Sequence, residues 1–197
     1  MSKRALLGLF GVLAWVGLAA ADASAFSASD DQKITHGRDV YQSKVSMKDG
    51  LFRMEMTTRG QTSIILHNAN GTYTVMPNEG MAMKMPRLQP GQRPVQGADN
   101  YAQYLEQQHA ERTGSETIDG RACDIYRFTD SESGALTTAW IWKEKMFPVR
   151  LETEGSDGKT LIEISNIQLG AAVPDDSFQL PAGVQVMDMG ALMGVRQ

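Results

Sequence analysis

The sequence predicts a mainly β protein: a curled antiparallel sheet that forms an open or half β-barrel, with one or two helices covering its concave face. Three observations support this fold class. Apolar and polar residues alternate with a period of two along most of the chain, turn signals separate the alternating runs at regular intervals, and one stretch has apolar residues at helical spacing. A sheet of about eight to ten strands has to curl or close to hide its apolar face.

The first half of the predicted domain is a succession of short strands. Residues 39–47 and 51–57 alternate and are joined by a Lys-Asp-Gly turn, which predicts a hairpin. Residues 61–67, 72–76 and 81–85 follow, separated by turns that contain Asn and Gly. This regular spacing is typical of an antiparallel meander.

A loop and a helix interrupt the strands. Residues 86–94 contain three prolines, which cannot donate to a sheet ladder, so we expect a loop there. Asp99 is a suitable helix cap, and residues 100–108 form an expected amphipathic helix whose apolar stripe consists of Tyr101, Tyr104 and Leu105. Residues 115–118 and 121–129 then predict another hairpin around an Asp-Gly turn.

The last third of the chain carries the most specific pattern. Trp140 and Trp142 are two residues apart on one expected strand, so both rings point to the same face and need a partner layer or a bound apolar molecule. Pro148 has no backbone N–H to donate to a neighbouring strand, and it leads into the next expected strand, residues 149–154. An Asp-Gly turn joins this strand to residues 160–164. We therefore expect a three-stranded meander.

The last third of the chain, which we call the C-terminal cassette, resembles the LolA/LolB-like lipoprotein-carrier superfamily and related bacterial envelope domains. In those families a Trp-containing strand, a Pro-initiated strand, a strand after a Gly turn and a final Phe-x-Leu-Pro-x-Gly loop follow in this order. The matching positions here are Trp140, Trp142, Pro148, Gly158, Phe178, Leu180, Pro181 and Gly183. The resemblance implies an open or half barrel with a helical lid and, loosely, lipoprotein handling in a diderm bacterium. It supplies no functional residue outside the cassette.

The N-terminus predicts export. A short basic region, Ser2-Lys3-Arg4, precedes the apolar residues 5–20, and Ala23-Ser24-Ala25 is the small-x-small pattern of a signal-peptidase site. The alternative is an uncleaved anchor helix, for which about sixteen apolar residues are short. We expect a signal peptide over residues 1–25 with cleavage after Ala25, and a periplasmic protein that does not span the membrane.

The mature chain is expected to contain a single LolA/LolB-like domain over residues 26–183. Residues 184–197 show no secure secondary structure, so we expect a C-terminal tail that is flexible. The full chain has 19 basic and 23 acidic side chains, and a mildly acidic protein is a poor nucleic-acid binder, so no nucleic-acid partner is expected.

The sequence predicts no enzyme and no cofactor. His36, His67 and His109 lie on separate elements without metal-ligand spacing, and no Gly-x-Ser-x-Gly signature is present. Cys123 is the single cysteine, which we interpret as a small buried hydrophobic side chain rather than a reactive thiol.

Methionine is the richest signal. Met54 and Met56 share a strand face with Phe52, and residues 81, 83 and 85 place three methionines on one face of a later strand. Three interpretations remain open: ordinary core filling, an adaptable apolar groove for an acyl chain or hydrophobic peptide, and a thioether site for Cu(I). The Lys between Met83 and Met85 and the lack of a nearby His argue against copper.

The function predicted from these features is non-catalytic binding of an apolar ligand in the cell envelope, as a carrier or sensor for a lipid, acyl chain or lipoprotein. The alternatives are a structural or regulatory protein-interaction module with a filled core, whose partner is an envelope protein, and Cu(I) binding through methionines. The residues expected to line the apolar groove are Phe52, Met54, Met83, Met85, Trp140 and Trp142.

Overall fold

The computed structural model describes residues 26–58, 60–85, 97–131 and 133–192, so the predicted signal peptide and the predicted proline loop lie outside the described residues. The described residues form twelve strands. They are β1 (Ser27–His36), β2 (Asp39–Lys48), β3 (Leu51–Thr58), β4 (Gln61–Asn68), β5 (Gly71–Met76), β6 (Met81–Lys84), β7 (Glu111–Ile118), β8 (Arg121–Thr129), β9 (Leu136–Trp142), β10 (Phe147–Gly155), β11 (Gly158–Leu169) and β12 (Gln185–Asp188). Two α-helices, α2 (Gly97–Gln107) and α3 (Met189–Leu192), and two 3-10 turns, η1 (Pro77–Glu79) and η2 (Asp175–Phe178), accompany them.

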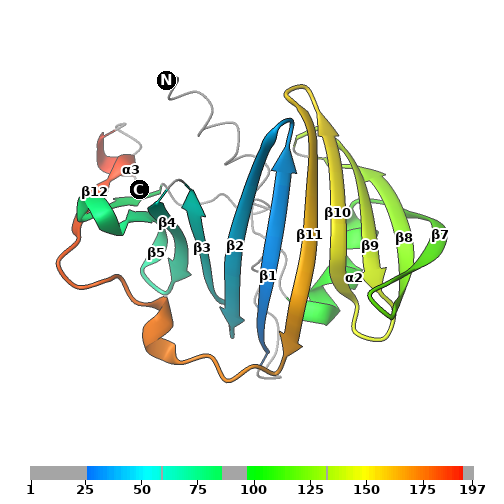
Figure 1. The fold of residues 1–197 in the computed structure, drawn as a ribbon, viewed down its shortest axis with the longest axis horizontal. Helices are drawn as coiled ribbons and strands as arrows, with labels where there is room; N and C mark the ends of the chain where they lie inside the picture. The colour runs from blue at the N-terminus through cyan, green and yellow to red at the C-terminus, as the bar shows by residue number, and fades with distance from the viewer. Residues whose placement is uncertain (1–25, 59, 86–96, 132, 193–197) are drawn as a thin grey trace. The chain divides into compact units, whose positions relative to one another are not determined.

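All twelve strands belong to one sheet in the order β12-β6-β5-β4-β3-β2-β1-β11-β10-β9-β8-β7, and Figure 1 shows β1 in blue beside β11 in gold. The sheet is not closed into a barrel. The pairings from β2 to β6 and from β7 to β11 are antiparallel, whereas β12 pairs with β6 in parallel. The predicted fold class, mainly β with an open sheet, is confirmed.

The chain divides into two compact units. Among the described residues, unit 1 comprises residues 32–40 and 97–165, and unit 2 comprises residues 26–31, 41–85 and 166–192. Strands β1, β2 and β11 contribute residues to both units. The prediction of a single domain over residues 26–183 stays a prediction.

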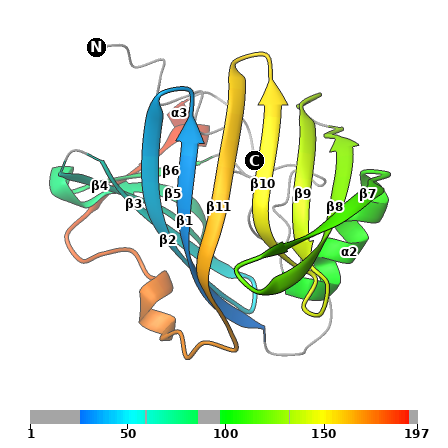
Figure 2. The same ribbon diagram turned by 45° about the vertical axis from the view of Figure 1, so that its right-hand side comes forward.

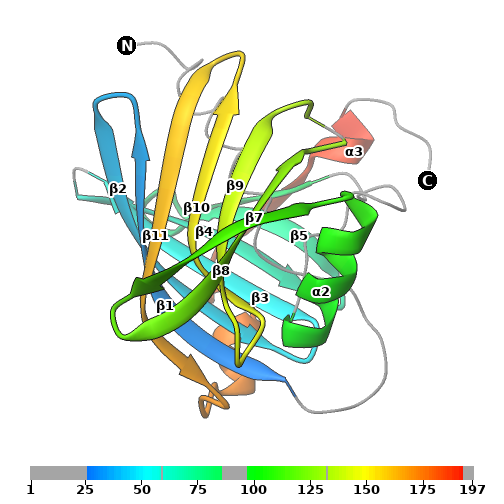
Figure 3. The same ribbon diagram turned by 90° about the vertical axis from the view of Figure 1, so that its right-hand side faces the viewer.

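Unit 1 contains the four-strand meander β7–β10 and helix α2. In β9 the side chains alternate, and Thr137, Ala139 and Ile141 are the buried ones. Helix α2 buries Tyr101 and Leu105, and the ring of Tyr104 meets Phe128 of β8 edge to face at 5.7 Å between centroids. Figures 2 and 3 show α2 lying next to β8. The apolar stripe predicted for this helix therefore faces the core of unit 1.

Helix α2 ends in a Schellman motif. The amide of Ala110 donates to the carbonyl of Leu105 and the amide of His109 to that of Glu106, both at 2.9 Å, and His109 has a φ of 51°. A glycine usually occupies this left-handed position, because other side chains are strained there. The backbone bonds of the motif hold His109 in that conformation at the point where the chain enters β7.

Unit 2 contains β3–β6 and β12, and one of its faces is covered by the segment after β11. Ile64, Leu66, Tyr73, Val75 and Ala82 form a buried cluster on that face with Phe178 of η2. Val173, Leu180 and Val184 pack against the cluster, and Asn68 Nδ2 donates to the Phe178 carbonyl at 2.9 Å. The final loop of the resemblance, Phe178 to Gly183, thus follows η2 across this face.

The structure adds two strands that the sequence pattern did not indicate. In β1 two inward positions are held by Asp30 and Gln32, both buried, so the strand lacks the apolar alternation that identifies the others. In the predicted tail, Gln185–Asp188 forms β12 because it pairs with β6, and the amide of Gln185 donates to the carbonyl of Gly80 at 2.8 Å. A parallel partner so distant in sequence leaves no local signal.

Candidate ligand-binding face

The registers of unit 2 bring methionines from five strands onto one sheet face. Residues that oppose each other across neighbouring strands point to the same side of a sheet. One row crosses six strands through such pairs: Val45, Met54, Ile65, Thr74, Met83 and Met187. Met187 of β12 therefore lies beside Met83 of β6, although the two are far apart in the sequence.

Further methionines lie on the same side. Met56 is two residues beyond Met54, and Met76 of β5 pairs with Met81 of β6. Met85 continues the register of β6, since its amide donates to the Thr72 carbonyl at 2.8 Å. We name this surface the methionine face, and its members are Met47, Phe52, Met54, Met56, Met76, Met81, Met83, Met85 and Met187.

Exposure increases along the methionine face from β3 to the sheet edge. Met54 is fully buried, and Phe52 and Met56 are nearly so. Met76, Met81 and Met83 are half-buried, whereas Met85 and Met187 are each 39% exposed. Thioether side chains at the accessible end can change rotamer at low cost because they are unbranched. The face thus combines a fixed apolar base with an adaptable rim.

The charged residue between the methionines of β6 lies on the other side of the sheet. Lys84 pairs with Tyr73 of β5 and Asp188 of β12, and Tyr73 belongs to the buried cluster of that opposite side. The Lys84 side chain passes 3.1 Å from the position that a Cβ on Gly71 would occupy. It therefore places no charge among the methionines, contrary to the sequence-based argument against copper.

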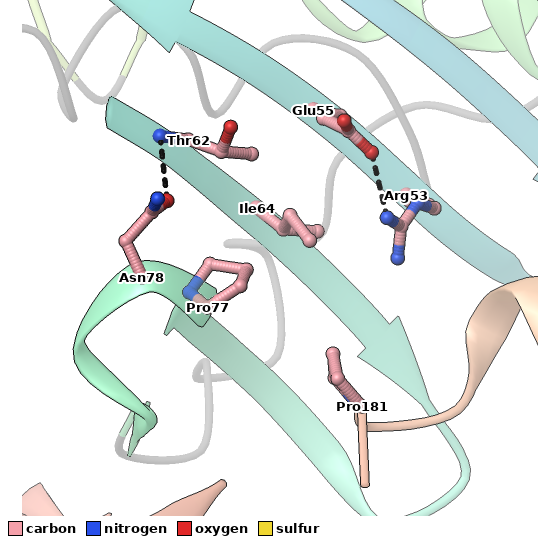
Figure 4. Close-up of a pocket in the computed structure, with 7 residues that line it drawn as sticks. All are labelled: Arg53, Glu55, Thr62, Ile64, Pro77, Asn78 and Pro181. Carbon is pink, nitrogen blue, oxygen red and sulfur yellow. Dashed lines mark hydrogen bonds and ion pairs between the residues drawn. The ribbon is translucent and has the colours of Figure 1, made fainter. Parts of the chain in front are cut away.

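An open pocket of about 420 Å³ lies on the side of unit 2 opposite the methionine face (Figure 4). Its lining residues are Arg53, Glu55, Thr62, Ile64, Pro77, Asn78 and Pro181. Arg53 and Glu55 form an ion pair at 2.7 Å, and Asn78 Oδ1 accepts from the Thr62 amide at 3.2 Å. These polar groups satisfy one another, so the pocket is a weaker candidate for an apolar ligand.

The two tryptophans lie in unit 1 and are partly covered by arginines. Trp140 and Trp142 alternate with the buried Ala139 and Ile141, so they occupy the other face of β9. The guanidinium carbons of Arg150 and Arg121 lie 5.3 and 5.2 Å from the ring centroids of Trp140 and Trp142, respectively. Trp140 Nε1 also donates to Glu116 at 2.7 Å.

The six predicted groove residues therefore divide between the units. The structure brings Phe52, Met54, Met83 and Met85 onto one face of unit 2 and places Trp140 and Trp142 in unit 1. Their role in ligand binding stays a prediction. Sequence reasoning missed Met187, because its place beside Met83 depends on the parallel ladder between β12 and β6.

Titratable groups in the described parts of the chain are mainly structural. Burial raises the pKa of the Cys123 thiol, which matches the interpretation of a buried hydrophobic side chain. Hydrogen bonds from Arg112 and Lys143 lower the pKa of Asp124. No group of three His, Cys, Asp or Glu side chains within the described ranges could hold a metal ion. No described helix is long and apolar enough to cross a membrane.

Solved structures share this fold at low sequence identity. An uncharacterised conserved protein from Thermus thermophilus is similar over 82% of this chain and 90% of its own, with 10% identity and a TM-score of 0.58. MucB, in the Pseudomonas aeruginosa MucA/MucB complex, is similar over 82% of this chain and 58% of its own, with 14% identity and a TM-score of 0.53. This chain therefore spans somewhat more than half the length of MucB.

The predicted resemblance to the LolA-like fold is confirmed, because MucB has a LolA-like fold. Such identities show likeness of fold alone.

Comparison with curated protein sequences finds no match. A family model does match: the domain of unknown function DUF4412 covers residues 31–145, from β1 into the turn between β9 and β10. The match includes the strands that build most of the methionine face and both tryptophans, and it extends over more than half of the sequence. The chain therefore belongs to the DUF4412 family.

Proposed function

We propose that this protein is a non-catalytic binding protein of the bacterial cell envelope and that its ligand contains an apolar chain, as in a lipid or a lipidated protein. The observation that supports this proposal most strongly is the methionine face of unit 2. Its base is buried and its rim at Met85 and Met187 is exposed, and flexible thioethers repack around ligands of varied shape.

The fold supports the same proposal. A LolA-like sheet is a scaffold of the carrier type, and the N-terminal residues 1–25 have the pattern of an export signal. Periplasmic location and cleavage after Ala25 are part of the proposal.

A protein partner is the second candidate. MucB, which shares the fold, has been solved in complex with MucA. An envelope protein could present an apolar segment to the same methionine face, so the two candidates differ in ligand rather than in site. A lipid supports the first candidate, and a peptide supports the second.

The experiment is displacement of a fluorescent fatty acid, such as parinaric acid, from the purified mature protein. Met83→Gln and Met187→Gln preserve side-chain length but place an amide against the apolar chain of the ligand. The amide then loses its hydrogen bonds to water, which costs roughly 1 to 3 kcal/mol. We expect each to weaken binding about tenfold or more.

The matched control is Met146→Gln in the turn of unit 1 between β9 and β10, which should leave affinity unchanged. Lipid retained in the natively purified protein, detected by mass spectrometry, would identify the ligand class. A parent protein that binds no apolar probe, or equal effects of all three substitutions, would refute the proposal.

A further inference from the structure

Two methionine-x-methionine segments meet at one corner of the unit 2 sheet. Met83 and Met85 belong to the first, and Met187 and Met189 to the second. Met187 pairs directly with Met83 in the parallel ladder between β12 and β6. Met189 begins α3, which contacts β6.

These methionines are close enough for their sulfur atoms to approach a common point. Opposed residues on neighbouring strands have Cβ atoms about 4.5 to 5.5 Å apart. Each methionine has three rotatable bonds, so the thioethers of Met83 and Met187 can approach a common point above the sheet. Met85 lies on the same side of β6, and its 39% exposure leaves its side chain free to rearrange.

Among the described residues, the two charged neighbours in the β6–β12 ladder do not oppose a cation at this corner. Lys84 and Asp188 pair with each other in the same ladder but lie on the other side of the sheet, because alternate residues of a strand point to opposite faces. The site would present thioether sulfur to the ion. Sulfur ligands of this type select soft monovalent ions such as Cu(I) and disfavour Mg²⁺, Ca²⁺ and Mn²⁺, which prefer oxygen.

We propose that Met83, Met85, Met187 and Met189 form a binding site for a soft monovalent metal ion, Cu(I), at the β6–β12 edge. This site goes beyond the proposed ligand function, and its chemistry requires sulfur rather than apolar surface. The ion binds without change of oxidation state, so the step needs no oxidant or reductant.

The test is a Cu(I) titration of the purified mature protein in ascorbate without air, with a chromogenic Cu(I) chelator as competitor. We expect one equivalent to bind. Met83→Leu/Met187→Leu should weaken that binding at least about tenfold, because two ligands are lost while apolar volume is kept. The titration contains the metal ion and no apolar probe, so its outcome does not depend on whether the protein binds the fluorescent fatty acid, and the two proposals can fail separately.

Two controls locate the metal. Met47→Leu/Met54→Leu replaces two buried methionines and should bind Cu(I) as the parent does. Cys123→Ala removes the single thiol, which is buried in unit 1, and should also leave binding unchanged.

Redox-inert Ag(I) gives a residue-level readout. In protein labelled with ¹³C at the methionine methyl groups, Ag(I) should shift the resonances of Met83, Met85, Met187 and Met189 and leave Met54 in place. The proposal is overturned if the parent binds no Cu(I), if Met83→Leu/Met187→Leu binds as the parent does, or if Cys123→Ala abolishes binding.

Discussion

The side chains on the buried sheet face of unit 1 differ in kind from those on the methionine face of unit 2. In unit 1 the buried residues are mainly branched or aromatic, among them Ile34, Ile141, Leu151, Ile162 and Ile164, and Tyr101 and Leu105 of α2 are buried with them. In unit 2 the methionine face has unbranched thioethers with graded exposure. β-Branched side chains have few rotamers, whereas methionine has many. Unit 1 is thus built for a fixed core, and unit 2 carries the adaptable surface.

The largest effect is expected at Phe178, which anchors the covered face of unit 2. Phe178→Ala leaves a cavity among Ile64, Leu66, Tyr73 and Val75, and large-to-small changes of this kind cost about 3 to 5 kcal/mol. Urea denaturation measures the loss. A cost below about 1 kcal/mol would mean that the segment after β11 does not hold to the sheet.

Ile141→Ala in β9 should cost about 2 to 5 kcal/mol, because the side chain is fully buried and the surrounding core is rigid. Met83→Ala on the half-buried part of the methionine face should cost less. Chemical denaturation of both variants compares the two faces directly. Equal losses would remove the distinction between a fixed core and an adaptable surface.

Met54→Leu is expected to change stability by less than about 1.5 kcal/mol, since it conserves apolar volume at a fully buried site. The more specific expectation concerns Ile141→Met, which replaces a branched side chain in unit 1 and should be the more costly of the two exchanges. Thermal unfolding with matched protein concentrations tests this order. The reverse order would show that the methionines are the more tightly packed set.

The smallest effect concerns pH and Asp124. Arg112 donates to this carboxylate at 2.6 Å, and the hydrogen bonds from Arg112 and Lys143 hold its pKa below the ordinary 3.8. A pKa lowered by folding contributes stability above pH about 4, and that contribution is lost as the pH falls through the folded-state value. Asp124→Asn should therefore destabilise the protein at pH 7, and its difference from the parent should shrink as the pH is lowered below about 4. Urea denaturation over a series of pH values detects this trend, and a constant difference would argue against it.

Local alternation predicted most strands because each apolar run has its own turn signals. The β10–β11 hairpin is one case: the Asp-Gly turn predicted it, and Gly155 pairs with Gly158 across that turn. The sequence pattern did not predict β1, because Asp30 and Gln32 occupy inward positions. It did not predict β12, because the strand that pairs with β12 is parallel to it and far away in the sequence.

For the candidate site too, local sequence patterns did not reveal contacts between strands that are far apart in the sequence. The period of two predicted correctly that Met83 and Met85 share a strand face, as do Phe52 and Met54. It could not place Met187 beside Met83, since that neighbour depends on the ladder between β6 and β12. It also treated Lys84 as part of the methionine cluster, whereas alternation puts its charge on the other side of the sheet.

The central claim is that the methionine face of unit 2, rather than the core of unit 1, receives an apolar chain. The most direct measurement is a methyl spectrum of protein labelled with ¹³C at the methionine methyl groups, recorded while a fatty acid is added. We expect shifts for Met81, Met83, Met85 and Met187 and an unchanged signal for Met146 of unit 1. Shifts confined to Met146, or none at saturating fatty acid, would contradict the account.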